Sequence, residues 1–232
     1  MARVLLPLPD TDFDVTEVAV PWKLLTGAGH EVVFATERGT VPAADPLLLT
    51  GVLFGQLGAE PEPKRFYAEM LPTMAPVTWD AVDTSYDALL LPGGHAPGMR
   101  QYLGSALLQQ RIRDFWDTGK PVAAICHGVL PLARAGVLDG VRTTCLPRYM
   151  ERSAYLSTAW LRGRYYRTYP AYVEDEVRAS GALFERGPRV LNRRGTMTEH
   201  SAAFTVRDGR YLSARWPGDA YLFALQLLEM LA

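Results

Sequence analysis

The sequence predicts a single α/β domain with a mainly parallel sheet that is covered by helices on both faces. Strand-like and helix-like segments alternate along the chain, which is the pattern of parallel sheets. A chain of 232 residues that is 48% hydrophobic and 21% charged can bury a large core. Because no internal repeat, low-complexity tract or linker divides the sequence, we expect one domain over residues 1–232.

The expected strands and helices follow one another from the start of the chain to the middle. They occupy residues 4–6, 15–28, 30–35, 87–91, 105–118 and 121–125. In the helix at 105–118, the apolar side chains of Leu108, Ile112 and Phe115 recur at helical spacing, so this face should point inward. A hairpin with a type I′ turn at Asp208-Gly209 and a helix at 219–231 are expected to close the domain.

Two segments depart from the alternation of strand and helix. Residues 42–80 hold many prolines and aromatic residues, which favours short helices and loops that form an inserted cap. Residues 147–172 are rich in Tyr, Arg and Trp, and we expect them to form a flap over the site. Substrate selectivity should depend on these two segments.

Charge and cysteine content exclude several classes of protein. The 24 basic residues nearly balance the 25 acidic ones, so neither a nucleic-acid-binding nor a membrane-binding surface is expected. The apolar run at residues 4–8 is too short for a signal peptide or a membrane span. Two cysteines are too few for a disulfide framework, which favours a reducing, cytoplasmic location. A small neutral or mildly polar molecule is the expected partner.

The strongest chemical signal is Cys126, where the apolar strand at 121–125 meets a helix. Ala124 and Gly128 lie two residues before and after it, as the sharp turn of a nucleophile elbow requires. The N-terminus of the following helix should stabilise a thiolate, and His127 is adjacent. We therefore expect a nucleophilic Cys126, whereas Cys145 is interpreted as a packing residue.

The segment Leu91-Pro-Gly-Gly-His95 offers a second set of site residues after another buried strand. Gly93 and Gly94 are candidates for binding an oxyanion or a substrate carbonyl through their backbone N–H groups, together with the N–H of His127. His95 is expected to line the cleft. The histidines lack the spacing of a metal site, and no phosphate-binding glycine motif is present, so neither a metal nor a cofactor is expected.

These motifs together resemble the ThiJ/PfpI superfamily, which is related to the class I glutamine amidotransferases. The resemblance rests on Ala124-Ile-Cys-His-Gly128, Leu91-Pro-Gly-Gly94, Lys120-Pro121, Glu17-Val-Ala-Val-Pro21 and the segment at 206–219. It is nearest to the larger branch of heat-shock chaperones and glyoxalases III. It implies a flavodoxin-like three-layer sandwich, a homodimer, and a hydrogen bond between Glu17 and the cysteine that allows the carboxyl to shuttle a proton.

Three functions are compatible with these residues. The first is a glyoxalase III-like enzyme without a cofactor, in which Cys126 adds to a 2-oxoaldehyde and Glu17 or His127 moves the proton. The second is a hydrolase or hydratase of an amide, isocyanide or specialised metabolite at the same elbow. A glutamine amidotransferase is disfavoured, because Glu199-His200 reverses the usual order. The third is a redox-sensing holdase chaperone with an exposed apolar cap.

Overall fold

The fold is that of a computed structural model, which describes residues 1–167, 169–190 and 193–232. Its central sheet has seven strands in the order β10-β11-β7-β6-β1-β3-β5, and every neighbouring pair is parallel except β10 with β11. The strands are β1 (Arg3–Pro7), β3 (Glu31–Thr36), β5 (Val77–Thr78), β6 (Ala88–Leu91), β7 (Val122–Ile125), β10 (Thr205–Asp208) and β11 (Tyr211–Ala214). The predicted α/β class with a mainly parallel sheet is confirmed.

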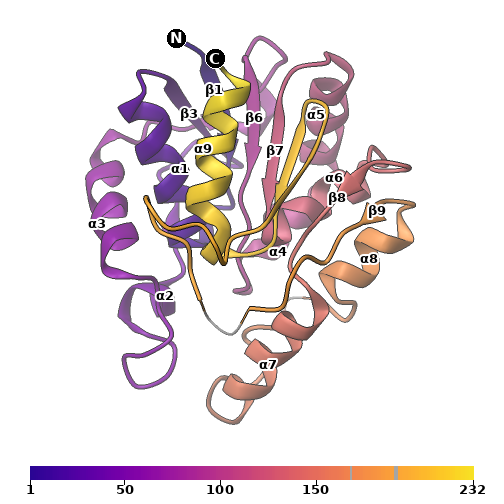
Figure 1. The fold of residues 1–232 in the computed structure, drawn as a ribbon. Helices are drawn as coiled ribbons and strands as arrows, with labels where there is room; N and C mark the ends of the chain where they lie inside the picture. Colours follow the sequence, from indigo (N-terminus) through magenta and orange to yellow (C-terminus); the bar gives the residue numbers. More distant parts are fainter. Residues whose placement is uncertain (168, 191–192) are drawn as a thin grey trace.

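Helices cover both faces of this sheet and complete the three layers of a flavodoxin-like sandwich (Figure 1). Helices α1 (Val15–Gly27), α3 (Pro61–Met70) and α9 (Ala220–Met230) pack together on one face. The other face carries α4 (Met99–Leu103), α5 (Ala106–Asp117) and α6 (Leu130–Arg134), with α8 (Val173–Ala179) against α6. In the described part of the chain, no helix is long and apolar enough to cross a membrane.

The remaining elements are short. The pair β2 (Thr11–Phe13) and β4 (Ala43–Ala44) and the pair β8 (Arg142–Thr143) and β9 (Leu183–Phe184) form small parallel sheets. Helices α2 (Pro46–Thr50) and α7 (Arg148–Arg162) lie beyond the carboxyl ends of the central strands, on the side opposite to the two termini (Figure 1). The 3₁₀ turns are η1 (Leu71–Thr73), η2 (Trp79–Ala81), η3 (Cys126–Val129) and η4 (Pro217–Asp219).

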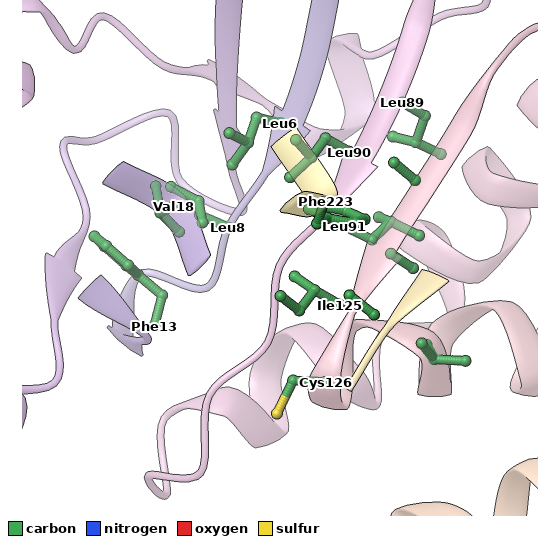
Figure 2. Close-up of a cluster of buried hydrophobic side chains, with 14 of the residues drawn as sticks. Leu6, Leu8, Phe13, Val18, Leu89, Leu90, Leu91, Ile125, Cys126 and Phe223 are labelled. Atoms are coloured by element: carbon green, nitrogen blue, oxygen red, sulfur yellow. The ribbon is translucent and has the colours of Figure 1, made fainter. Parts of the chain in front are cut away.

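Local sequence explains where the central elements begin and which faces they bury. Asp14 precedes α1, and its side chain accepts hydrogen bonds from the N–H groups of Thr16 and Glu17, as at a capped helix start. Every residue of β6 and β7 is buried, as parallel strands between two helical layers require. Figure 2 shows Cys126 at the edge of this apolar core, below Ile125 and Leu91.

The segment at 42–80 is not only a cap. Within it, β5 adds a strand to the central sheet beside β3, and α3 packs against α1. Only α2 and the loop that follows it extend away from the sandwich (Figure 1). We therefore keep the name cap loop for residues 45–60 alone. The predicted flap at 147–172 contains α7 and the turn after it, and residue 168 lies outside the described residues.

The predicted hairpin is present, but its turn is not type I′. Asp208 pairs with Tyr211, so Gly209 and Arg210 form a two-residue loop. Gly209 has a φ of 57°, whereas Arg210 is not among the residues with positive φ. A type I′ turn needs positive φ at both positions, and glycine at the first position alone is the pattern of type II′. The expected type I′ turn at Asp208-Gly209 was wrong because Asp208 still pairs in β10, which places Arg210 in the loop, where its Cβ atom disfavours positive φ.

The ends of β6 and β7 approach each other so closely that glycine is required. A Cβ atom on Gly128 would lie 2.1 Å from the carbonyl oxygen of Leu91 and 2.7 Å from that of Pro92. A Cβ atom on Gly93 would lie 2.7 Å from the backbone nitrogen of His127. Gly128, the small residue expected two positions after Cys126, is therefore needed for the close approach of the loops that follow β6 and β7.

Replacing Gly128 with alanine should lower the free energy of unfolding by about 3 kcal/mol, because the methyl group would overpack against the backbone of Leu91. Gly27→Ala in α1 is the matched control, since no atom lies within 4 Å of its added methyl group. That variant should be neutral or stabilised by up to about 1 kcal/mol. Urea unfolding measures both, and a Gly128→Ala protein as stable as wild type would contradict the close approach.

Candidate active site

The predicted site residues meet at the carboxyl ends of the three central strands. Glu17 follows β1, Gly93 follows β6, and Cys126 follows β7. The chain proceeds from β1 to β3 and β5 on one side and then returns to β6 and β7 on the other, so the sheet order reverses between β1 and β6. In open α/β sheets this point is where ligands bind.

Cys126 has the strained backbone of a nucleophile elbow. Its φ is 60°, a conformation that residues with a Cβ atom rarely adopt, and strain of this kind occurs often at active sites. The residue begins the 3₁₀ turn η3, which continues into the five-residue helix α6. Its side chain is only 3% exposed.

Glu17 is fully buried beside the elbow. Its Oε2 accepts a hydrogen bond of 2.8 Å from the N–H of Gly93, and its Oε1 has no hydrogen-bond partner of standard geometry among the described atoms. Burial and the nearby Asp14 raise the pKa of Glu17 well above its usual value, and the hydrogen bond from Gly93 and the contact with Cys126 only partly offset this. Burial therefore favours the protonated form of Glu17.

This hydrogen bond changes the role expected for Gly93. The Gly93 N–H donates to Glu17, and the Gly93 carbonyl accepts a hydrogen bond of 3.0 Å from the N–H of Asp14. Both backbone groups are used inside the protein, so Gly93 positions Glu17 and does not supply an oxyanion donor. Gly94 has a φ of 156°, and a Cβ atom there would lie 2.9 Å from the carbonyl oxygen of Asp12.

Asp14 adds a second carboxyl that the sequence analysis did not assign to the site. Burial raises its pKa to about 6, although the hydrogen bonds from Glu17 N–H and Thr16 N–H and the charge of Arg194 oppose that effect. Its position directly before an amphipathic helix is typical of a helix cap. Its closeness to Cys126 follows only from the fold.

The two histidines lie against Cys126. The sulfur of Cys126 is 3.5 Å from Nδ1 of His127, and the ring of His95 meets the ring of His127 edge-on at 4.5 Å. Burial lowers the pKa of His95 to about 4 and lowers that of His127 well below its usual value, helped by positive charge on nearby groups including Arg134 and Arg167. Both rings are therefore neutral at neutral pH.

The expectation of a stabilised thiolate is wrong for this closed site. Burial raises the pKa of the Cys126 thiol well above its usual value, and the carboxyls of Glu17 and Asp14 add to the effect. The N–H of His127 opposes it more weakly. Because the helix that follows is short, its dipole contributes little. Cys145 is buried, as predicted for a packing residue.

The flap and the cap loop meet over this site through Asp45. The side chain of Asp45 is 1% exposed and accepts hydrogen bonds from the hydroxyls of Tyr165, at 3.0 Å, and Tyr166, at 3.2 Å. The ring of Tyr166 lies 5.8 Å from that of His95. A further link joins Arg162 to the carbonyl of Val52 at 2.8 Å. We call these contacts the latch.

The pair Glu199-His200 does not join the elbow. In the described chain, Glu199 forms hydrogen bonds within its own turn: its Oε1 accepts from the N–H of Ser201, and its N–H donates to the hydroxyl of Thr196. No hydrogen bond links either residue to Cys126 in residues 1–167, 169–190 and 193–232. This arrangement gives no support to an amidotransferase triad.

Comparison with known proteins places the chain in a family. The model of the ThiJ/PfpI-like family matches residues 8–188. An uncharacterized protein of Schizosaccharomyces pombe is 30% identical over 99% of this chain and 84% of its own length, and a deglycase of Pyrococcus horikoshii is 28% identical over 98% of each. The crystal structure of glyoxalase III from Candida albicans matches 99% of this chain and 97% of its own, with a TM-score of 0.63 and 19% identity, which shows a shared fold. The chain belongs to the ThiJ/PfpI-like family.

Proposed function

We propose that the protein is a cofactor-independent cysteine enzyme that acts on small carbonyl compounds and converts a 2-oxoaldehyde into a 2-hydroxy acid. The observation that carries the proposal is the position of the Cys126 sulfur, 3.5 Å from the His127 imidazole and in contact with the buried carboxyl of Glu17, whose protonated form is favoured by burial. A thiol, a base and an acid are the groups needed to add sulfur to an aldehyde and then move a proton between its two carbons.

In the first step, the Cys126 sulfur forms a bond to the aldehyde carbon. His127 Nδ1 accepts the thiol proton, and the Glu17 carboxyl donates its proton to the aldehyde oxygen, which gives a neutral hemithioacetal. Glu17 is then a carboxylate and His127 an imidazolium. The N–H of Gly94 is the proposed donor to the substrate oxygen, since that of Gly93 is already bound to Glu17.

In the second step, the Glu17 carboxylate removes the proton from the former aldehyde carbon while His127 protonates the neighbouring ketone oxygen, which gives an enediol. Glu17 returns its proton to the neighbouring carbon, and His127 takes the proton of the remaining enol, which leaves a thioester. Water then cleaves the thioester: its hydroxyl joins the acyl carbon, its remaining proton goes to the Glu17 carboxylate, and His127 gives its proton to the leaving Cys126 sulfur. This releases the 2-hydroxy acid and restores the thiol, the neutral imidazole and the carboxyl. Addition of water is the net change, so no oxidant or reductant is needed.

Substrate access requires the latch to open, because Cys126 is 3% exposed beneath it. Opening requires loss of the two tyrosine hydrogen bonds to Asp45. Closure afterwards would exclude water until the thioester forms. The deglycase names of several relatives support an enzyme of carbonyl compounds.

The other two functions remain alternatives with less support. A hydrolase or hydratase would use the same Cys126, but the geometry offers no additional group specific to an amide or isocyanide. A holdase would use exposed apolar side chains, and Phe54 and Trp160 are 80% and 67% exposed where cap loop and flap meet. The assembled thiol, imidazole and carboxyl favour the enzyme. The homodimer and the cytoplasmic location stay predictions.

The purified protein should convert methylglyoxal to lactate in the presence of a chelator, and Cys126→Ser should lower the rate at least about a thousandfold, because no other group forms the hemithioacetal. Cys145→Ser removes the other buried cysteine and should retain activity. Chiral chromatography of lactate measures the product. Wild-type turnover by Cys126→Ser would overturn the mechanism.

Asp14→Asn should stabilise the folded protein above pH 6. The folded-state pKa of Asp14 is about 6, above its ordinary value of 3.8, so ionisation costs wild-type stability as the pH rises through this interval. The asparagine retains an acceptor for the helix cap. The free energy of unfolding should exceed that of wild type by roughly 1–3 kcal/mol at pH 8, and the difference should shrink toward pH 4.

Urea unfolding across this pH range tests the Asp14 prediction. Asp117→Asn, on the exposed end of α5, is the matched control and should show no such pH dependence. A stability difference for Asp14→Asn that is the same at both pH values would show that burial does not hold a proton on Asp14.

Removing the two tyrosine hydroxyls of the latch should expose Cys126. In a Cys145→Ser background, Tyr165→Phe/Tyr166→Phe should raise the rate of Cys126 alkylation by iodoacetamide about tenfold, since two hydrogen bonds to a carboxylate are lost. Tyr155→Phe on α7 is the control for loss of a hydroxyl from the flap. Mass spectrometry follows the reaction, and an unchanged rate would show that the latch does not govern access.

A further inference from the structure

Three metal-ligating side chains converge at the elbow although the sequence spacing gave no sign of them. The donor atoms of His95, Cys126 and His127 all lie within 4.8 Å of one another. They come from two loops, one after β6 and one after β7, that the close packing at Gly93 and Gly128 holds together. The spacing of histidines within single segments predicted no metal site, whereas these ligands come from two separate loops.

The geometry of the pair Cys126 and His127 already matches tetrahedral coordination. With a zinc–sulfur bond of about 2.3 Å and a zinc–nitrogen bond of about 2.0 Å, a tetrahedral angle places the two donor atoms about 3.5 Å apart. The observed distance from Sγ to Nδ1 is 3.5 Å. A rotation of the partly exposed His95 side chain that moves its nitrogen by about 1 Å would bring the third donor to the same spacing.

We infer that His95, Cys126 and His127 bind a divalent cation of the zinc class, with the fourth coordination position open. One sulfur and two imidazole nitrogens are ligands for zinc and its neighbours in the transition series, whereas magnesium and calcium prefer oxygen. On binding, the Cys126 S–H bond breaks, the sulfur forms a bond to the cation, and the proton is released to solvent. No change of oxidation state is involved.

Occupation of this site would block the proposed reaction, because the sulfur lone pair that adds to the aldehyde would be bound to the cation. The cation would act as a reversible inhibitor that a chelator removes. The cation site shares its side chains with the proposed function. It does not depend on the proposed reaction, since cation binding is measured without substrate. A protein that binds the cation but lacks glyoxalase activity would therefore overturn the proposed function alone.

Cobalt(II) titration of the full-length protein tests the site, because cobalt substitutes for zinc and absorbs light. We expect one bound cobalt ion per chain, a sulfur-to-cobalt charge-transfer band, and visible bands of tetrahedral intensity. Zinc chloride should displace the cobalt and abolish these bands. Cys126→Ser should remove the charge-transfer band, whereas Cys145→Ser, which alters the other buried cysteine, should retain it.

The variant His95→Ala distinguishes a three-ligand site from binding of cobalt to the thiol alone. Loss of a direct ligand should weaken cobalt binding more than about tenfold, because loss of an outer-shell partner alone has an effect of that size. Circular dichroism checks that each variant is folded. If His95→Ala does not fold, the loss of the charge-transfer band in Cys126→Ser tests the inference. Absence of a charge-transfer band in wild type, its persistence in Cys126→Ser, or wild-type affinity in a folded His95→Ala protein would overturn the inference.

Discussion

The hydrogen bond from the Gly93 N–H to the buried carboxyl of Glu17 is the interaction on which the site depends. It is 2.8 Å long and joins the first helix to the loop after β6. The same loop lies against the elbow, where a Cβ atom on Gly93 would approach the His127 nitrogen to 2.7 Å. One hydrogen bond and one close backbone approach thus fix the positions of Glu17 and Cys126 relative to each other.

Burial of this arrangement determines its chemistry. Glu17, Cys126 and His127 are at most 3% exposed, and none of them forms an ion pair with a described residue. Each group therefore favours its neutral form, which means a protonated carboxyl, a thiol and an unprotonated imidazole. In the proposed reaction, proton transfer would therefore accompany formation of the bond between sulfur and carbon, without a preformed thiolate. The latch matters for the same reason, because water entering the site would stabilise the charged forms.

Much of the fold and the centre of the site could be predicted from the sequence because the signals are local. The apolar strand, the turn and the small residues around Cys126 lie within a few positions of one another, and Asp14 has the side chain of a helix cap. The use of the Gly93 N–H could not be predicted, since Glu17 is distant in sequence. The raised pKa of Cys126 and the metal-ligating cluster depend on contacts between separate loops.

The contacts of the latch could not be predicted from the sequence either. Asp45 and Tyr166 lie in segments of irregular composition, for which neither periodicity nor a motif predicts a partner. Their hydrogen bond joins the cap loop to the flap, and its position depends on how both segments pack on the sandwich. The hairpin turn differed from expectation because the last strand pair includes Asp208, so that the loop is Gly209-Arg210 and only its glycine has positive φ.

The central claim is that the resting site is neutral, with the proton on Glu17. Infrared difference spectroscopy between wild type and Glu17→Gln at neutral pH tests it most directly. We expect a C=O stretching band of a protonated carboxyl in wild type that is absent from the variant. A carboxylate band in its place would show that Glu17 is ionised, and would contradict both the neutral site and the acid role of Glu17 in the first step.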